Sequence, residues 1–411
     1  MDNMKNIPAS AKSLPLDVAG SSTFGRYPKI SDAKTYNMIL SDEWLVPSPG
    51  WALRLKILPE GQGRRIYTSN RFGKMIAVID NNVYVIYPNL TTTKVGELAT
   101  YTGDVFIDEN NTYQIGICDK EKIYIYNWAT NVFSTAATPP DPDLNFLPGY
   151  LTYQDTYFIA PNIQGLNNPS TWRISQSGNG LVFPDDAQHE GALQTKADYA
   201  IAAVRVPSRG NLLFVFGNTV TEYWYDVGGQ LFPYQKSTNA NVDFGCANVA
   251  TIAASDSLVC WLGINEESGP VIMYSTGGEI STISSDGINF QLGQLKNPRS
   301  SSAFFIKQYG HLLYQITFYD PEDNLTLLYD FTTKKFFNLC DENRNIIIVR
   351  NVAFFNNTYY FVSTIDGNIY ELSSELTTYD YGDGKVQEIP RSRICSPIRQ
   401  LDASYFNVKM L

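Results

Sequence analysis

The chain has 411 residues and a formal net charge of -10. Such an acidic balance excludes a general nucleic-acid binder, because gripping phosphate requires clustered Lys and Arg that displace counterions. With 27 Tyr, 22 Phe, 29 Gly and 21 Pro, the composition favours pleated strands joined by tight turns, and we expect an all-β protein.

The N-terminal region is expected to contribute little to the hydrophobic core. Residues 1–20 are polar and small, with Pro8 and Pro15, and we expect a flexible N-terminal arm that orders only against a partner. It lacks the apolar stretch of a signal peptide, and nowhere do about 18 apolar residues run unbroken as a membrane span requires. We therefore expect assembly in a cytoplasm and no membrane partner. Residues 21–51 are divided by prolines, so at most two short strands fit there.

A strand-turn-strand pattern then recurs seven times. The hairpins span residues 75–86, 115–126, 150–160, 212–225, 258–274, 304–318 and 352–362. One marker from each, namely Val83, Ile123, Tyr157, Leu213, Val259, Leu313 and Tyr360, gives spacings of 34 to 56 residues. Propeller blades of four strands repeat at about 40 to 50 residues.

The pattern therefore predicts a β-propeller of six or seven irregular blades over residues 21–395. Weaker segments at 92–98, 131–135, 279–283 and 326–338 supply outer strands. A pair of β-sandwiches is the alternative, because it also produces regular short strands. Residues 164–199 show no clear strand and are interpreted as a long excursion between blades. Residues 396–411 are interpreted as a final strand or the start of a further β region.

Few residues suggest chemistry. His189 and His311 have no second ligand at metal spacing, so we predict no metal site. Glycosidases use two carboxylates across a cleft. Candidates of that type are Glu222, Asp226 and Asp320, but Glu222 lies within a strand and is expected to be exposed. The basic segment 61–65 is interpreted as a solvated loop. The five cysteines are far apart and are interpreted as free and mostly buried. We predict no catalytic and no cofactor-binding residue.

The central segment contains a recognisable set of residues. Its residues are Phe216, Gly217, Thr221, Glu222, Tyr223, Trp224, Gly228, Gly245, Cys246, Trp261 and Gly263. In this set the chain resembles the packaged-DNA stabilisation protein family, the tail hub or nozzle of short-tailed bacteriophages. These are aromatic, glycine and buried-cysteine positions, so the resemblance implies structural roles for them and no chemistry.

The resemblance implies a non-enzymatic virion protein of the phage tail. It implies a homo-oligomer, a hexameric ring below the portal and its adaptor, which extends the DNA channel and helps retain packaged DNA. Expected partners are the portal-adaptor protein, a tail needle or plug, tailspikes or fibres, and double-stranded DNA in the lumen without sequence-specific contact. The alternative is a carbohydrate-binding or carbohydrate-degrading propeller, such as a depolymerase or adhesin. It would place Trp44, Trp51, Trp128 and Trp172 in one open cleft near paired carboxylates.

Overall fold

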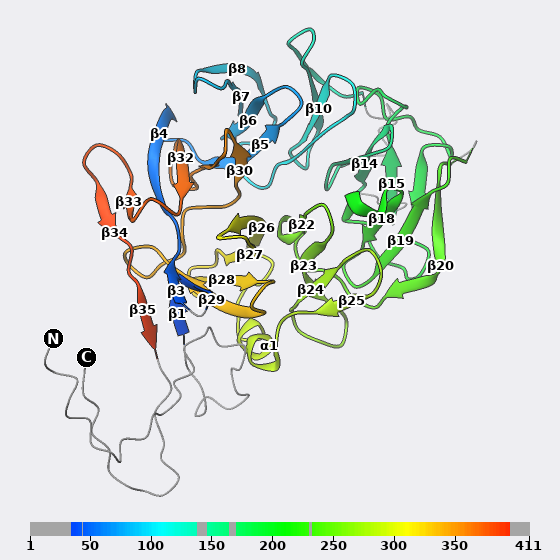
Figure 1. Ribbon diagram of the computed structural model, residues 1–411. Helices are drawn as coiled ribbons and strands as arrows, with labels where there is room; N and C mark the ends of the chain where they lie inside the picture. The colour runs from blue at the N-terminus through cyan, green and yellow to red at the C-terminus, as the bar shows by residue number, and fades with distance from the viewer. Residues whose placement is uncertain (1–33, 43, 138–145, 164–169, 230–231, 395–411) are drawn as a thin grey trace, which may run out of the picture.

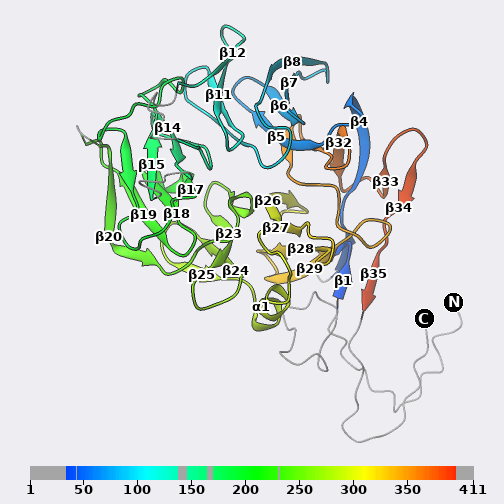
Figure 2. The same ribbon diagram turned by 180° about the vertical axis from the view of Figure 1, so that it is seen from behind.

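The computed structural model describes residues 34–42, 44–137, 146–163, 170–229 and 232–394. Its strands form a two-stranded sheet and seven larger sheets, and the seven are arranged in a ring with β22 and β26 near the centre (Figures 1 and 2). Each of the seven larger sheets is one blade of a closed β-propeller. The prediction of a propeller is confirmed with seven blades, and the sandwich alternative is wrong.

The first four blades follow one another along the chain. Blade 1 contains β5 (Gly63–Ser69), β6 (Lys74–Ile79), β7 (Asn82–Ile86) and β8 (Thr92–Glu97). Blade 2 contains β9 (Phe106–Glu109), β10 (Gln114–Cys118), β11 (Ile123–Asn127) and β12 (Val132–Thr135). Blade 3 contains β13 (Thr152–Gln154), β14 (Tyr157–Pro161), β15 (Thr171–Ile174) and β16 (Glu190–Ala192). Blade 4 contains β17 (Ala202–Arg205), β18 (Leu212–Phe216), β19 (Thr221–Asp226) and β20 (Tyr234–Val242), with the 3-10 helix η1 (Pro207–Arg209).

The remaining blades carry the helices or share strands with the N-terminal part. Blade 5 contains β21 (Gly245–Cys246), β22 (Ala253–Ala254), β23 (Val259–Ile264), β24 (Val271–Ser275) and β25 (Ile280–Thr282), with the 3-10 helix η2 (Val249–Thr251). The helix α1 (Asp286–Leu292) follows it. Blade 6 contains β26 (Ser301–Gln308), β27 (His311–Phe318), β28 (Leu325–Asp330) and β29 (Lys335–Leu339). Blade 7 contains β30 (Ala353–Phe355), β31 (Thr358–Val362), β32 (Gly367–Ser373) and β4 (Gly50–Leu58).

The ring is closed by β4, which precedes blade 1 in the chain but pairs antiparallel with β32 of blade 7. Within β4, Leu55 lies opposite Ile369 and Leu53 opposite Tyr370. A blade buries its faces only against its neighbours, so the ring is stable only when the last blade is complete. The N-terminal strand therefore joins the two ends of the propeller.

Further strands extend blades 6 and 7 beyond four. In blade 6, β1 (Lys34–Tyr36) lies parallel to β29, and β35 (Ser392–Ile394) pairs with β1. In blade 7, β33 (Thr378–Asp380) lies parallel to β4 and pairs with β34 (Val386–Glu388). A separate hairpin joins β2 (Met38–Ser41) and β3 (Trp44–Pro47). The boundaries 21–395 therefore enclose more than a propeller.

Each predicted hairpin lies in a different one of the seven blades, but the strand positions that the hairpins occupy differ from blade to blade. Residues 75–86 form the two middle strands of blade 1, whereas 304–318 form the two inner strands of blade 6. The Asn356 and Asn357 turn has φ of 47° and 64°, the left-handed values that a two-residue hairpin turn of type I′ requires. Short local patterns thus predict the hairpins, and contacts between blades decide which strand lies innermost.

Two expectations on organisation are wrong. Residues 164–199 are not a free excursion, because β15 and β16 within them complete blade 3. Residues 21–51 were expected to hold at most two short strands, but β1, β2 and β3 lie there and β4 begins at Gly50. In both cases the strands are too short for alternation to be read, and long-range pairing supplies their partners. The predicted arm at 1–20 and the segment at 396–411 lie outside the described residues.

The core consists of apolar clusters between neighbouring blades. Four cysteines are free and buried among the described residues, namely Cys118, Cys246, Cys260 and Cys340, while Cys395 lies outside them. Burial raises the pKa of the Cys246 thiol to about 12, so it remains protonated near neutral pH and packs as a small apolar group. The described residues contain no helix with the length and apolar character of a membrane span.

Candidate functional site: the axial channel and the blade junctions

The innermost strands of the blades surround an axial channel. It encloses a cavity of about 440 Å³. All seven blades line it, through Arg65, Tyr67, Asp108, Tyr150, Arg205, Ala253, Phe304 and Asn351 among others. A volume of this size accommodates a small molecule and not a nucleic-acid duplex.

Polar side chains connect the blades around this channel. Asn351 at the entry to β30 donates to the carbonyl oxygen of Ile66 at 2.7 Å, linking blade 7 to blade 1. Asp108 on β9 accepts from the backbone N–H of Tyr153 at 2.7 Å and from the Thr152 hydroxyl at 3.2 Å, linking blade 2 to blade 3. These contacts fix the positions of blade 7 against blade 1 and of blade 2 against blade 3.

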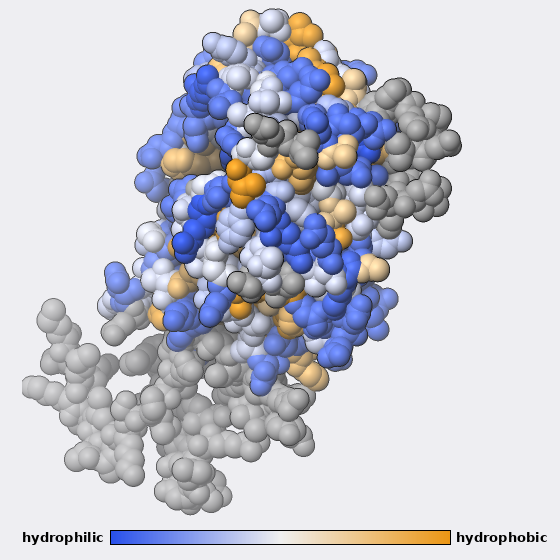
Figure 3. All heavy atoms as spheres, turned by 90° about the vertical axis from the view of Figure 1, so that its right-hand side faces the viewer, coloured by the Kyte–Doolittle hydropathy of each residue, from blue (hydrophilic) through white to orange (hydrophobic). Residues whose placement is uncertain are grey.

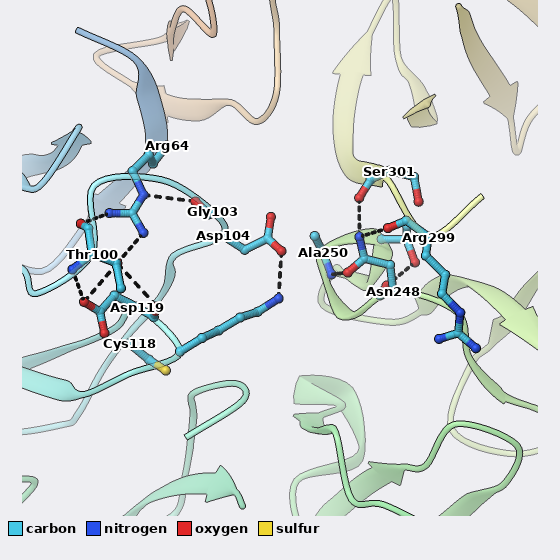
Figure 4. Close-up of polar contacts among 12 residues, drawn as sticks. Arg64, Thr100, Gly103, Asp104, Cys118, Asp119, Asn248, Ala250, Arg299 and Ser301 are labelled. Atoms are coloured by element: carbon cyan, nitrogen blue, oxygen red, sulfur yellow. Dashed lines mark hydrogen bonds and ion pairs between the residues drawn. The ribbon is translucent and has the colours of Figure 1, made fainter. Parts of the chain in front are cut away.

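A cluster of charges links blades 1, 2 and 7, and Figure 4 shows the part of it around Arg64 and Asp104. Arg64 is buried and donates to the carbonyl oxygens of Gly103 at 3.0 Å and Thr100 at 2.6 Å. Asp104 binds Lys120 at 2.8 Å and also accepts from Arg350. Arg64 was expected in a solvated loop, and that interpretation is wrong, because β5 begins at Gly63 and carries this arginine into a blade junction.

A second cluster links blades 5 and 6, and Figure 4 shows it across from the first. The Asn248 side chain donates to the carbonyl oxygens of Arg299 and Ser301, both at 2.7 Å. Arg299 donates in return to the carbonyl oxygen of Ala247 at 3.1 Å. The two blades are therefore joined by reciprocal contacts between their connecting loops.

The recognised central residues gather at the junction of blades 4 and 5. The backbone N–H of Cys246 donates to the carbonyl oxygen of Gly217 at 2.9 Å. A Cβ at Gly245 would lie 2.3 Å from that same oxygen, so only glycine permits this approach. Phe216 packs edge-on against Trp261, with ring centroids 5.2 Å apart. Trp261 donates to the carbonyl oxygen of Gly245 at 3.3 Å.

The other members of the set lie close by in the same two blades. Thr221 donates to the carbonyl oxygen of Phe244 at 2.7 Å, and Tyr223 donates to that of Gly278 at 2.9 Å. Gly263 leaves room for Met273, whose sulfur would lie 2.6 Å from an added Cβ. Gly228 has φ of +63° in the turn after β19. Each of these residues shapes packing or a turn.

Glu222 is fully buried, with 0% of its surface exposed, and the expectation of an exposed position is wrong. Its Oε1 accepts from the backbone N–H groups of Gln194 and Thr195, at 2.8 and 2.6 Å. Its Oε2 accepts from the indole N–H of Trp224 at 3.0 Å. The segment it holds follows β16, so Glu222 joins blade 3 to blade 4. Sequence alternation could not reveal this, because both faces of β19 are covered by neighbouring blades.

The other candidate carboxylates do not form a glycosidase pair. Asp320 caps a turn in blade 6 by accepting from the N–H of Glu322 at 3.0 Å. Burial raises the pKa of Asp226, and the influence of Asp155 acts in the same direction. Asp226 ends β19 in blade 4 and Asp320 lies between β27 and β28 of blade 6, so the structure does not bring the candidate carboxylates together as a glycosidase pair.

The tryptophans also do not line one cleft. Trp51, Trp128 and Trp172 are buried in blades 7, 2 and 3, whereas Trp44 on β3 is 76% exposed. Trp172 packs against Phe232 and Tyr234, with ring centroids 5.2 and 5.4 Å away. The aromatic surface is therefore used for packing between strands. Figure 3 shows the face over blades 3 and 4 as largely hydrophilic, with small separate apolar spots.

Neither histidine belongs to a metal site. His189 Nδ1 lies 2.6 Å from an Asp186 oxygen, and His311 Nδ1 lies 2.8 Å from an Asp330 oxygen. Within the described ranges, no group of three His, Cys, Asp or Glu side chains is placed to hold a metal ion. Each histidine instead has one carboxylate partner in its own blade or loop.

The fold and its junctions define the class: a closed seven-bladed β-propeller in which N- and C-terminal strands share the last blade. The family model described as "Bacteriophage P22 Gp10, beta-propeller" matches residues 27–338, and the chain belongs to this phage stabilisation family. The resemblance read from the central residues is thereby confirmed.

Solved structures agree on the fold alone. A streptogramin B lyase structure is 16% identical, with a TM-score of 0.51, over 79% of this chain and 97% of that chain. Virginiamycin B lyase from Staphylococcus aureus is 15% identical, with a TM-score of 0.51, over 79% of this chain and 99% of that chain. No curated protein matches the chain.

Proposed function

We propose that this chain is a structural protein of the phage virion that forms the tail hub or nozzle. In this role a ring of copies, six by analogy with the family, lies below the portal and its adaptor. It extends the DNA channel and helps retain packaged DNA. It also docks the needle or plug and the tailspikes or fibres. The chain would be assembled in the host cytoplasm and would act without catalysis.

The observation that carries this proposal is the match of the family model over residues 27–338. The residues of the central segment that resemble the family, such as Trp261, contribute to packing within and between blades. The burial of Trp51, Trp128 and Trp172 in separate blades argues against the carbohydrate alternative, which needs aromatic rings open to solvent.

The size of the axial channel adds a constraint on the route of DNA. A cavity of about 440 Å³ is the size of a small-molecule site. A DNA conduit would therefore run between subunits of the ring and not through a propeller. With a net charge of -10 on each copy, such a conduit would tend to repel phosphate and let DNA slide.

The test is to delete the gene in its phage, allow heads to package, and measure the DNA that purified capsids retain. We expect capsids that fill and then leak, with portal and adaptor present but needle and fibres absent. Stable, full particles that fail only to adsorb or to degrade surface sugar would contradict the hub and support the carbohydrate-active alternative.

A further inference from the structure

Two arginines, Arg65 and Arg205, line the axial channel. Arg65 has no ion pair or hydrogen bond within the described part of the chain, and its Nε is buried without a partner. Arg205 lines the same cavity from blade 4 and contacts Asp108 at 3.5 Å. Arg65 is half-buried and lines the channel, so its guanidinium has no acceptor there among the described protein residues, and a bound anion would supply one.

The carboxylates nearby are already occupied. Asp108 Oδ2 accepts from Tyr153 and Thr152, and its Oδ1 accepts from the N–H of Glu109 at 2.9 Å. Asp104, whose field reaches Arg65, is bound by Lys120 and Arg350. Asp256 lines the cavity from an exposed loop. Arg65 therefore forms an ion pair with none of these carboxylates.

Two tyrosines add neutral donors to the same cavity. Burial raises the pKa of Tyr150 to about 12, although Arg65 opposes the shift. Burial, followed by the charges of Asp108 and Glu109, also raises the pKa of Tyr67, while Arg205 and Arg65 oppose it. Both phenols therefore stay protonated near neutral pH and can donate. Tyr67 lies two residues after Arg65 on β5, and both residues line the cavity.

We propose that the axial channel binds a small oxyanion, a phosphate or carboxylate group, between Arg65 and Arg205, with Tyr67 and Tyr150 as further donors. The planar guanidinium presents paired N–H groups that match two oxygens of such an anion. The cavity of about 440 Å³ has the size of a small-molecule site. The site goes beyond the proposed virion role and does not depend on it.

The test is isothermal titration calorimetry on the full chain in chloride buffer, with inorganic phosphate and succinate as separate probes. We expect saturable binding of at least one probe by the wild type. Arg65→Gln should weaken that binding at least tenfold, and Arg205→Gln should weaken it by a smaller factor. The control is Arg54→Gln, because Arg54 lies on β4 and pairs with Glu371 away from the channel. It should bind as the wild type does.

Thermal unfolding without anion separates binding from structure. Arg65→Gln removes a cation without a partner, so its Tm should not fall below that of the wild type. Tighter binding of phosphate than of succinate would identify a phosphate ligand. Tighter binding of succinate would identify a carboxylate ligand. Absence of saturable binding of either probe would overturn the proposal, as would unchanged affinity in Arg65→Gln. If circular dichroism shows that Arg65→Gln does not fold, the affinities of Tyr67→Phe and Arg205→Gln test the proposal instead. Unchanged anion affinity in both of these variants would overturn the proposal.

Discussion

Glu222 shows how one residue can be recognised in the sequence and yet misplaced. Its position in an aromatic strand suggested a solvent-facing carboxylate, but four hydrogen-bond donors from two blades converge on it. Local alternation reports only that a strand exists. The partners at Gln194 and Thr195 come from a segment whose strands were not predicted.

The first prediction concerns this carboxylate. Glu222→Ala should lower the free energy of unfolding by about 3 kcal/mol, because it leaves buried N–H groups without an acceptor. Urea unfolding measures the loss. Glu388→Ala on the exposed strand β34 is the matched control and should change stability by less than about 0.5 kcal/mol. Equal effects of the two substitutions would contradict the clamp role of Glu222.

The second prediction concerns pH. Burial alone would raise the pKa of Asp104, but Lys120 and Arg350 outweigh it and hold the pKa below its ordinary value of 3.8. The folded state thus binds this proton less readily than the unfolded state. The stabilisation is present above about pH 4 and is lost as pH falls through the folded pKa.

Asp104→Asn should therefore lower the free energy of unfolding by about 2 kcal/mol at pH 7. The difference from the wild type should shrink as the pH falls below about 4, because the unfolded wild type then binds a proton at Asp104 more readily than the folded protein does. Urea unfolding at pH 7 and pH 3 measures both values. A difference that stays constant between these pH values would show that Asp104 does not act through its charge.

Among the strands, β4 has a structural role that its sequence does not indicate. Residues 50–58 read GWALRLKIL, which suggests a strand but does not indicate that it belongs to the last blade. Trp51 within it stacks on Tyr379, with ring centroids 3.6 Å apart, and meets Phe361 edge-on at 6.0 Å. This ring therefore joins β4 to strands from both sides of blade 7.

The third prediction compares two tryptophans. Trp51→Ala should lower the free energy of unfolding by about 4 kcal/mol, because it opens a large cavity in a packed blade. Trp44→Ala, at a 76% exposed position on β3, should change it by less than about 0.5 kcal/mol. Denaturant titrations of both variants measure the values. A large loss for Trp44→Ala would mean that the β2–β3 hairpin carries more of the fold than its exposure indicates.

The whole molecule depends on closure of the ring. Blade 7 takes three strands from the C-terminal part and one from residues 50–58, so the propeller is complete only when these distant segments meet. The fourth prediction is that deletion of residues 1–58 exposes the edge of β32 and reduces the protection of its amides against hydrogen exchange at least a hundredfold.

The control for that deletion is a short Gly-Ser insertion at Gly269, where an added side chain meets no atom within 4 Å. This insertion lengthens an exposed loop and leaves β4 in place, so β32 should keep its protection. Unchanged exchange at β32 after the deletion would show that blade 7 is stable without its closing strand.

The sequence by itself determined the all-β class, the seven hairpins and the family, because strand alternation, turn residues and a set of aromatic and glycine positions are local signals. Only the tertiary structure decided which strands complete each blade and that β4 closes the ring. It also placed Glu222 and Arg64 in the interior and brought Arg65 and Arg205 to one channel. The reason is physical: these outcomes depend on pairing and packing between residues far apart in the chain, and no local pattern encodes such partners.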